Sequence, residues 1–195
     1  MNKKNYILLA NKAANTQINE LKKIKKIFNK SFIEAVDLIL NCKGKVIFAG
    51  IGKSGLIARK ISATFSSVGI PSFFCDPAQA LHGDMGQIEK RDILIIFSYS
   101  GNTLELTNML KYANRYRIKI IGVASKPDSI LLKASDIKLI LPKVREADST
   151  GMVPTTSTTI TLLLGDCLAT TAMHQKKFSK EKFKVFHPGG NIGKS

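Results

Sequence analysis

The sequence is short of cysteine, arginine and tryptophan, and these shortages exclude several classes of protein. Its 195 residues include three cysteines, five arginines and no tryptophan. Cys42, Cys75 and Cys167 are far apart and form no CxxC motif, so we expect free thiols in a reducing, cytoplasmic compartment. No apolar run reaches the roughly 18 residues that a membrane span needs, and the N-terminus lacks the small-residue cleavage pattern of a secretory signal. We therefore expect no membrane association and no secretion.

The scarcity of arginine also decides how the positive charge is interpreted. The formal net charge is +16, from 30 basic and 14 acidic side chains. Proteins that bind nucleic acids favour arginine, because its guanidinium group makes paired hydrogen bonds to nucleobases and phosphates. Here lysine supplies most of the basic residues. The densest basic stretch, residues 22–30, lies on a predicted helix and is more typical of a solvated helix face. We expect a field that attracts a small anion and no nucleic-acid partner.

Helices and strands are predicted to alternate along most of the chain. Apolar residues between positions 11 and 40 recur at helical spacing. The short apolar runs that follow are continuous rather than alternating, which is typical of parallel strands buried on both faces. The predicted strands are residues 45–49, 72–75, 92–98, 119–124 and 137–141, and the predicted helices between and after them are residues 54–67, 103–115, 129–134 and 158–174.

This order predicts an α/β protein with three layers, in which helices cover both faces of a doubly wound, flavodoxin-like parallel sheet. We expect this domain to comprise residues 44–195, with residues 1–43 forming a helical segment that packs on it. Ligands of such sheets bind at the carboxyl ends of the strands. The loops that follow the strands are therefore the place to look for chemistry.

The loop after the first predicted strand is rich in glycine. Residues 50–55, GIGKSG, match the GxGxxG pattern of a dinucleotide-binding turn, and Asp76 ends the second strand about where a ribose-binding acid would stand. A lone match to this pattern is weak evidence, and the spacing of a Walker phosphate loop is absent. Lys53 inside the loop is either a surface lysine or a cation at the ligand mouth that neutralises an oxyanion.

Two predicted helices begin with clusters of hydroxyl side chains. Residues 98–103, SYSGNT, follow the third strand, and residues 154–159, PTTSTT, open the long C-terminal helix. Either cluster alone is explained equally well by helix capping. Two such helix starts in one small α/β domain favour a phosphorylated ligand, because backbone N–H groups, hydroxyls and the helix dipole converge there.

The candidate acid–base residues lie near these loops. Glu105 and Glu146 each follow a strand, and for a lone glutamate near a helix start, complementing the helix dipole is the commoner role. His82 lies in the segment ALHGD. His187 stands beside Pro-Gly-Gly in a rigid loop, where a polar function is favoured over core packing.

These loops together resemble the sugar isomerase (SIS) domain of the D-arabinose 5-phosphate isomerase family. The matching pieces stand in the family's order and close to its spacing over residues 45–194; they are GIGKSGLIARK, PSFFCDPAQALHGDMG, SYSGNTLE, PTTSTT and FHPGGNIGK. The resemblance implies a single SIS domain that interconverts D-ribulose 5-phosphate and D-arabinose 5-phosphate through an enediol. It also implies a place in Kdo and lipopolysaccharide biosynthesis and a homotetramer whose sites bridge subunits.

The family's catalytic residues fall on four positions of this chain. From the chemistry of isomerisation we expect Glu146 to be the proton-transfer base and Lys53 the electrostatic stabiliser. We expect His187 to be the acid or ring-opening group and Glu105 to be its partner or a second acid–base residue. Together with the anion-binding loops, the resemblance predicts substrate contacts from Gly52, Ser54, Gly69, Ile70, His82, Ser98, Ser100, Gly101, Thr103, Thr156 and Ser157. We expect no cofactor and no required metal, although Asp76 stands where zinc-binding relatives can place a histidine.

One further departure from the family and two alternative functions remain at this stage. Many family members carry a pair of CBS domains after the SIS domain, and this chain has none, either because it is naturally short or because it is truncated. The main alternative function is a non-catalytic SIS module that senses a sugar phosphate. The other is an NAD-dependent enzyme that uses residues 50–55 and Asp76.

Overall fold

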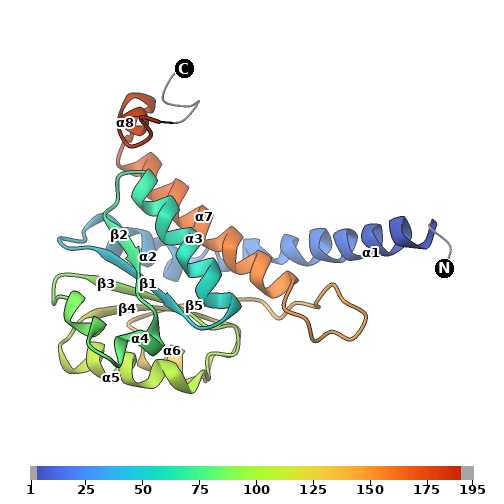
Figure 1. Ribbon diagram of the computed structural model, residues 1–195, viewed down its shortest axis with the longest axis horizontal. Coiled ribbons are helices and arrows are strands. Elements are labelled where there is room, and N and C mark those ends of the chain that lie inside the picture. The colour runs from blue at the N-terminus through green and yellow to red at the C-terminus, as the bar shows by residue number, and fades with distance from the viewer. Residues whose placement is uncertain (1–3, 190–195) are drawn as a thin grey trace.

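A five-stranded parallel sheet forms the centre of the computed structural model, which describes residues 4–189 (Figure 1). The strand order is β2-β1-β3-β4-β5, and every neighbouring pair is parallel. The strands are β1 (Val46–Gly50), β2 (Ser72–Phe74), β3 (Ile93–Phe97), β4 (Lys119–Ala124) and β5 (Ile137–Ile140). This is the flavodoxin-like strand order, so the predicted doubly wound α/β fold is confirmed.

Most of the helices lie in two layers, one on each face of the sheet (Figure 1). Before β1 the chain forms α1 (Lys4–Leu21), the 3₁₀ helix η1 (Lys22–Ile27) and α2 (Lys30–Leu40). The remaining helices are α3 (Lys53–Ser67), α4 (Pro77–Ala80), η2 (Asp84–Gln87), η3 (Leu104–Leu106), α5 (Thr107–Arg115), α6 (Ile130–Ala134), α7 (Thr156–Gln175) and α8 (Lys180–Val185).

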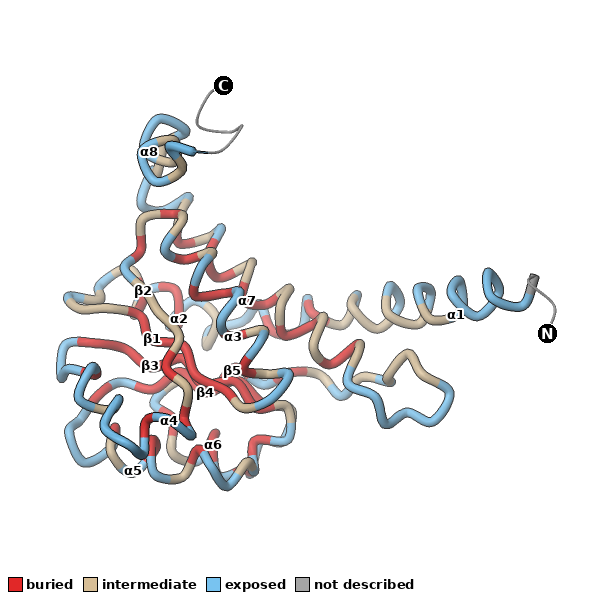
Figure 2. The backbone as a smooth tube through the Cα atoms, viewed as in Figure 1, coloured by how far each residue is buried: buried red, intermediate tan, exposed pale blue. Residues whose placement is uncertain are grey.

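Alternate residues of each strand enter different hydrophobic cores. Val46 and Phe48 of β1 belong to the core beneath α2, α3 and α7, whereas Ile47 and Ala49 belong to the core beneath α4, α5 and α6. Successive side chains of a strand point to opposite faces, so a sheet covered on both sides needs apolar residues at every position. Figure 2 shows the result as a buried sheet between two partly exposed helical layers.

The helical spacing of residues 11–40 predicts one continuous helix, and this prediction is wrong. Residues 11–40 do not form a single helix, because the chain breaks at Phe28 and Asn29 between η1 and α2. The Asn29 side chain accepts a hydrogen bond from the Ser31 backbone N–H at 2.9 Å and so caps α2. Asparagine is among the residues preferred at this position. The apolar spacing runs on through the break and therefore conceals it.

Helix α1 extends away from the body of the domain (Figures 1 and 2). Residues 5–12 are exposed, and only the later turns contact α7. There the Thr159 hydroxyl donates to Gln17 Oε1 at 2.8 Å, and the Arg145 backbone N–H donates to Glu20 Oε2 at 3.1 Å. In the described part of the chain, no helix is both long and apolar enough to cross a membrane.

Helices α3 and α7 approach each other closely at Gly165. A Cβ atom built on Gly165 would lie 2.6 Å from Ile61 Cγ1 and closer still to Ile61 Cδ1. Because Ile61 is fully buried and β-branched, it has little freedom to move aside. The absence of a side chain at position 165 therefore sets the distance between the two helices.

Gly165→Ala is expected to lower the free energy of unfolding by about 1–3 kcal/mol, the usual cost of overpacking a core. The same change in an Ile61→Ala background should instead raise that free energy, because alanine is favoured over glycine in a helix by about 1 kcal/mol. Urea denaturation of the four proteins gives the comparison. Equal destabilisation in both backgrounds would show that Ile61 does not set the helix distance.

Candidate active site

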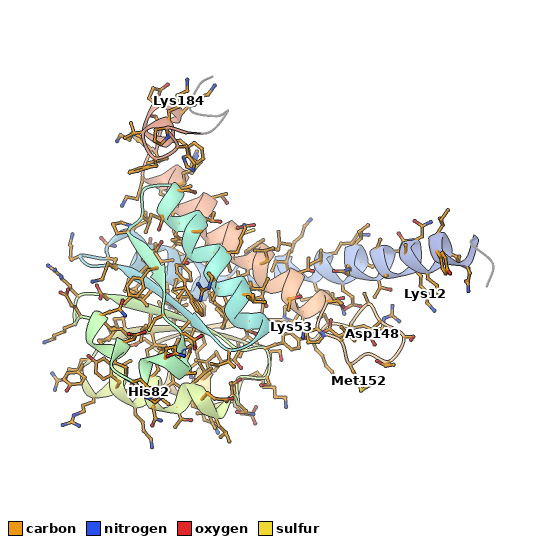
Figure 3. All side chains as sticks on the ribbon, in the orientation of Figure 1. Lys12, Lys53, His82, Asp148, Met152 and Lys184 are labelled. Carbon is orange, nitrogen blue, oxygen red and sulfur yellow. The ribbon has the colours of Figure 1, made fainter. Side chains whose placement is uncertain are left out.

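The carboxyl ends of the strands border a cavity of about 430 Å³. It lies where the first turns of α3 and α7 meet the loop after β3 and the segment between β5 and α7, and Figure 3 shows Lys53, Asp148 and Met152 on this side of the molecule. The lining residues are Ile51, Lys53, Ser54, Ile57, Tyr99, Ser100, Glu146, Gly151, Met152, Pro154, Ser157, Thr158 and Thr161. Five of the residues predicted from the sequence therefore share one cavity: Lys53, Ser54, Ser100, Glu146 and Ser157.

The first turns of two helices supply much of the cavity's polar lining. Lys53 and Ser54 begin α3, and Ser157 and Thr158 stand in the first turn of α7. A helix N-terminus carries a partial positive charge, so a lysine there is unfavourable for the helix itself. The ammonium of Lys53 and the two dipoles together favour an anion in the cavity.

Glu146 is held at the start of α7 by one of its two carboxylate oxygens. Its Oε2 atom accepts hydrogen bonds from the Thr155 backbone N–H at 2.8 Å, the Thr155 hydroxyl at 3.0 Å and the Ser157 backbone N–H at 3.2 Å. Burial alone would raise the pKa of this carboxyl, but the hydrogen bonds from Ser157 and Thr155 outweigh it and hold the pKa below its usual value. No described residue bonds to Oε1, which leaves that oxygen for a ligand.

Some hydroxyl groups of the serine loop, residues 98–103 after β3, hold the loop together, and another lines the cavity. The Ser98 and Thr103 hydroxyls bond to each other at 2.7 Å, and Ser98 Oγ also accepts from the Gly101 backbone N–H at 3.1 Å. Ser98 and Gly101 are buried, so these residues hold the shape of the loop. Ser100 is exposed and lines the cavity.

Tyr99 belongs to the cavity wall but was not among the residues predicted from the sequence. Its hydroxyl accepts from the Val144 backbone N–H at 2.9 Å and donates to the Pro142 carbonyl at 3.3 Å, which ties the serine loop to the chain after β5. Burial raises the pKa of this phenol, so it stays protonated at neutral pH. Its position between Ser98 and Ser100 is the sequence feature that could have indicated its place in the cavity wall.

Four predicted residues lie at the same edge of the sheet but outside the cavity. Gly52 and Asp76 border a separate hollow on the other side of α3, and the Asp76 side chain caps α4 by accepting from the Ala78 backbone N–H at 2.9 Å. Glu105 is exposed in η3. His82 is exposed in the turn after α4, where Figure 3 shows it apart from Lys53.

Thr156 is a further predicted hydroxyl residue that does not line the cavity. Its side chain is 0% exposed, and its Oγ1 atom has no hydrogen-bond partner among the described residues. The neighbouring Ser157 lines the cavity instead.

The remaining predicted residues lie at the opposite end of the domain. Gly69 and Ile70 form the turn between α3 and β2, at the amino end of the sheet, and Gly69 packs against Phe178. His187 follows α8, which Figure 1 shows at that same end. Its Nδ1 atom lies 2.8 Å from the Phe183 carbonyl, and its ring stacks on the Phe183 ring. The last residues of the motif FHPGGNIGK, 190–194, lie outside the described residues.

A known domain family accounts for this arrangement. The model of the SIS domain matches residues 39–171, a span that contains all five strands and every residue that lines the cavity. The chain belongs to the SIS domain family. The resemblance found in the sequence motifs is thereby confirmed.

Relatives of this SIS chain include proteins named for one activity. Arabinose 5-phosphate isomerase KpsF of Escherichia coli O6:H1 is 42% identical over 170 residues, which are 87% of this chain and 52% of that protein. The probable arabinose 5-phosphate isomerase of Haemophilus influenzae is 38% identical over 190 residues, which are 97% of this chain and 56% of that protein. The chain thus spans about half the length of the curated relatives it matches.

Solved structures of SIS proteins match the whole fold. The structure of an E. coli CFT073 protein in complex with arabinose 5-phosphate superimposes with a TM-score of 0.93 at 34% identity, and the match covers 96% of this chain and 100% of that chain. A structure titled a putative sugar-phosphate isomerase from Listeria monocytogenes has the same TM-score at 31% identity, over 97% of this chain. At these identities and coverages, the likeness extends to most of the SIS chain, including much of α1.

The lowered pKa of Glu146 makes a testable link between this residue and stability. Because the folded-state pKa lies below the ordinary value of 4.5, ionised Glu146 stabilises the fold fully above that value, and its contribution is lost as the pH falls through the folded pKa. Glu146→Gln should therefore lower the free energy of unfolding at pH 7 and lower it less at pH 4.

Denaturant unfolding at the two pH values measures this difference. Glu105→Gln is the control, since a change at an exposed position usually alters stability by about 0.5 kcal/mol or less. If Glu146→Gln lowers the free energy of unfolding by the same amount at both pH values, the hydrogen-bonded, ionised state assigned to Glu146 is contradicted.

Proposed function

We propose that this protein is an aldose–ketose isomerase that interconverts D-ribulose 5-phosphate and D-arabinose 5-phosphate. The observation that carries the proposal is the single cavity in which Lys53, Ser100, Glu146 and Ser157 meet at two helix N-termini. Several curated relatives of about 40% identity bear the name arabinose 5-phosphate isomerase, and the sugar phosphate in the E. coli complex fits that name. Both facts support the same substrate.

The cavity offers the groups that an enediol mechanism needs. Isomerisation moves one proton between C1 and C2 of the sugar, which requires a base at the carbon and a cation at the oxygen. Glu146 presents a carboxylate whose Oε1 has no bond to a described residue, so this oxygen takes the proton from C1 of the ketose and returns it to C2. Lys53 stabilises the negative charge that develops on the enediolate oxygen.

The phosphate binds beside the start of α3 and the serine loop. The first backbone N–H groups of α7 already donate to Glu146, so they are less available to a ligand. The start of α3 and the Ser100 hydroxyl have no such carboxylate on them among the described residues. Their positive partial charges suit a phosphate dianion.

His187 acts in this proposal from a second copy of the chain. A carbonyl oxygen only accepts hydrogen bonds, so the contact with the Phe183 carbonyl places the proton of a neutral imidazole on Nδ1. Nε2 then has no hydrogen bond to any residue that the structure describes. That nitrogen suits a group that opens the sugar ring or moves a hydroxyl proton. It lies at the end of the domain opposite Lys53, so within one chain the two do not share the cavity.

The division of the predicted residues between two ends of the molecule supports an assembly with shared sites. Gly69, Ile70 and His187 gather at the α8 end, where Val185 and Phe186 expose apolar surface around a hollow of about 300 Å³. A symmetric oligomer can bring this end of one copy to the cavity of another. We propose a homotetramer of this kind, and the places of Glu105 and His82 relative to the substrate remain predictions.

The biological setting that we propose rests on the family resemblance. Arabinose 5-phosphate made in the cytoplasm would supply Kdo for lipopolysaccharide. The sensing alternative, a SIS module that binds a sugar phosphate without converting it, predicts binding with no turnover.

Incubation with D-ribulose 5-phosphate in D₂O tests the reaction. We expect arabinose 5-phosphate with deuterium at C2, seen by proton NMR, because an enediol base exchanges its proton with solvent. Glu146→Gln should reduce turnover by about 10²–10⁴-fold, the usual contribution of a general base. Binding without conversion by the wild-type protein would favour the sensing alternative, and conversion without any exchange would favour hydride transfer.

Mixed oligomers test the shared site. Lys53→Ala and His187→Ala proteins should each be inactive, whereas a 1:1 mixture that has been dissociated and reassociated should regain up to about a quarter of wild-type activity. In a symmetric oligomer, that is the share of sites that draw both intact residues from different chains. If the mixture stays inactive while mass-labelled subunits demonstrably exchange, both residues act within one chain.

A further inference from the structure

The loop between β5 and α7 forms one wall of the cavity, and much of this wall is exposed. Gly151, Met152 and Pro154 line the cavity, yet Met152 is 76% exposed and residues 149–151 are exposed as well. A wall with so little packing behind it needs another source of order. The structure supplies this order through the carboxylate of Asp148.

The two carboxylate oxygens of Asp148 accept hydrogen bonds from several donors in this loop. Its Oδ2 atom accepts from the Thr150 backbone N–H at 2.9 Å, from the Thr150 hydroxyl and, at 3.4 Å, from the Met152 backbone N–H. Its Oδ1 atom accepts from the Val153 backbone N–H at 3.0 Å. The chain turns between these donors at Gly151, whose φ of 69° lies in the left-handed region that glycine adopts without strain.

The charge of Asp148 makes these bonds stronger than bonds between neutral groups. The Thr150 hydroxyl and the backbone N–H groups of Val153, Thr150 and Met152 lower the pKa of the carboxyl to about 2. It is therefore ionised throughout the neutral range, and hydrogen bonds to an ionised acceptor are about twice as strong as neutral ones.

Glu146 does not depend on this network. Its Oε2 atom is held by Thr155 and Ser157 at the start of α7, and the Ala147 backbone N–H donates to Thr155 Oγ1 at 2.9 Å. The two carboxylates thus organise adjacent parts of one segment separately. Loss of Asp148 would leave the base in place and release the wall.

We propose that Asp148 is a positioning residue whose carboxylate holds residues 149–153 so that Gly151 and Met152 form a wall against the bound sugar phosphate. The inference rests on the proposed function for its substrate. It assigns Gly151 and Met152 to substrate binding and Glu146 to the chemical step.

Asp148→Ala tests this division of roles through the split between KM and kcat. The wall contacts the substrate alike in the ground state and the transition state, so KM should rise about tenfold while kcat stays within about threefold of the wild-type value. Asp148→Asn keeps one acceptor oxygen, so its KM should lie between those of the wild type and Asp148→Ala. Ser149→Ala is the matched control, because Ser149 is the adjacent exposed residue and its side chain makes no hydrogen bond to a described residue.

Hydrogen–deuterium exchange supplies a readout that does not depend on turnover. Peptides covering residues 149–154 should exchange faster in Asp148→Ala than in the wild type or in Ser149→Ala, while peptides from the start of α7 keep their protection. If the wild-type protein does not interconvert the two sugars, the proposed function fails, and the exchange data still report whether Asp148 orders the loop.

Three outcomes would overturn the proposal. One is unchanged exchange of residues 149–154 in Asp148→Ala. Another is a KM within about twofold of the wild type. The third is a fall in kcat at constant KM, which would place Asp148 in the chemical step and not in the wall. Should Asp148→Ala fail to fold, the same criteria apply to Asp148→Asn.

Discussion

The hydrogen bonds between Glu146 and the start of α7 are the interaction on which the site depends. They join the end of the sheet to the first turn of the long helix, and they place a carboxylate beside a lysine at the start of α3. The close contact at Gly165 then fixes how far apart the two helices lie. Without these two constraints, the dipoles of α3 and α7 would not meet at one cavity.

The site combines charges that would be unfavourable if they were apart. Lys53 opposes the dipole of its own helix, and Glu146 gives up part of its hydration to accept three hydrogen bonds. The donors at the start of α7 stabilise the carboxylate, and an anionic ligand in the shared cavity would complement the lysine. Costs of this kind concentrate at functional sites, because the rest of the fold can bear them.

The sequence predicted the sheet more accurately than the site. Strands buried on both faces leave an unmistakable apolar run, and β4 was predicted with its observed bounds. The break at Asn29 was missed because the apolar spacing continues across it. The sequence analysis identified Lys53, Ser100 and Glu146 as site residues. It did not identify Tyr99 or the wall around Met152, because contacts between loops produce no periodic pattern in the sequence. The distance between His187 and Lys53 likewise follows only from the fold.

The bonds that fasten α1 to the rest of the domain join distant parts of the chain. Arg145 donates to Glu20 across 125 positions, and Thr159 donates to Gln17 across 142. Contacts of such long sequence separation are formed late, because much of the chain must be ordered before they can close. On a translating ribosome, α1 waits until nearly the whole domain has emerged before it meets these partners. We therefore expect the contacts of α1 beside the cavity to be completed late in folding.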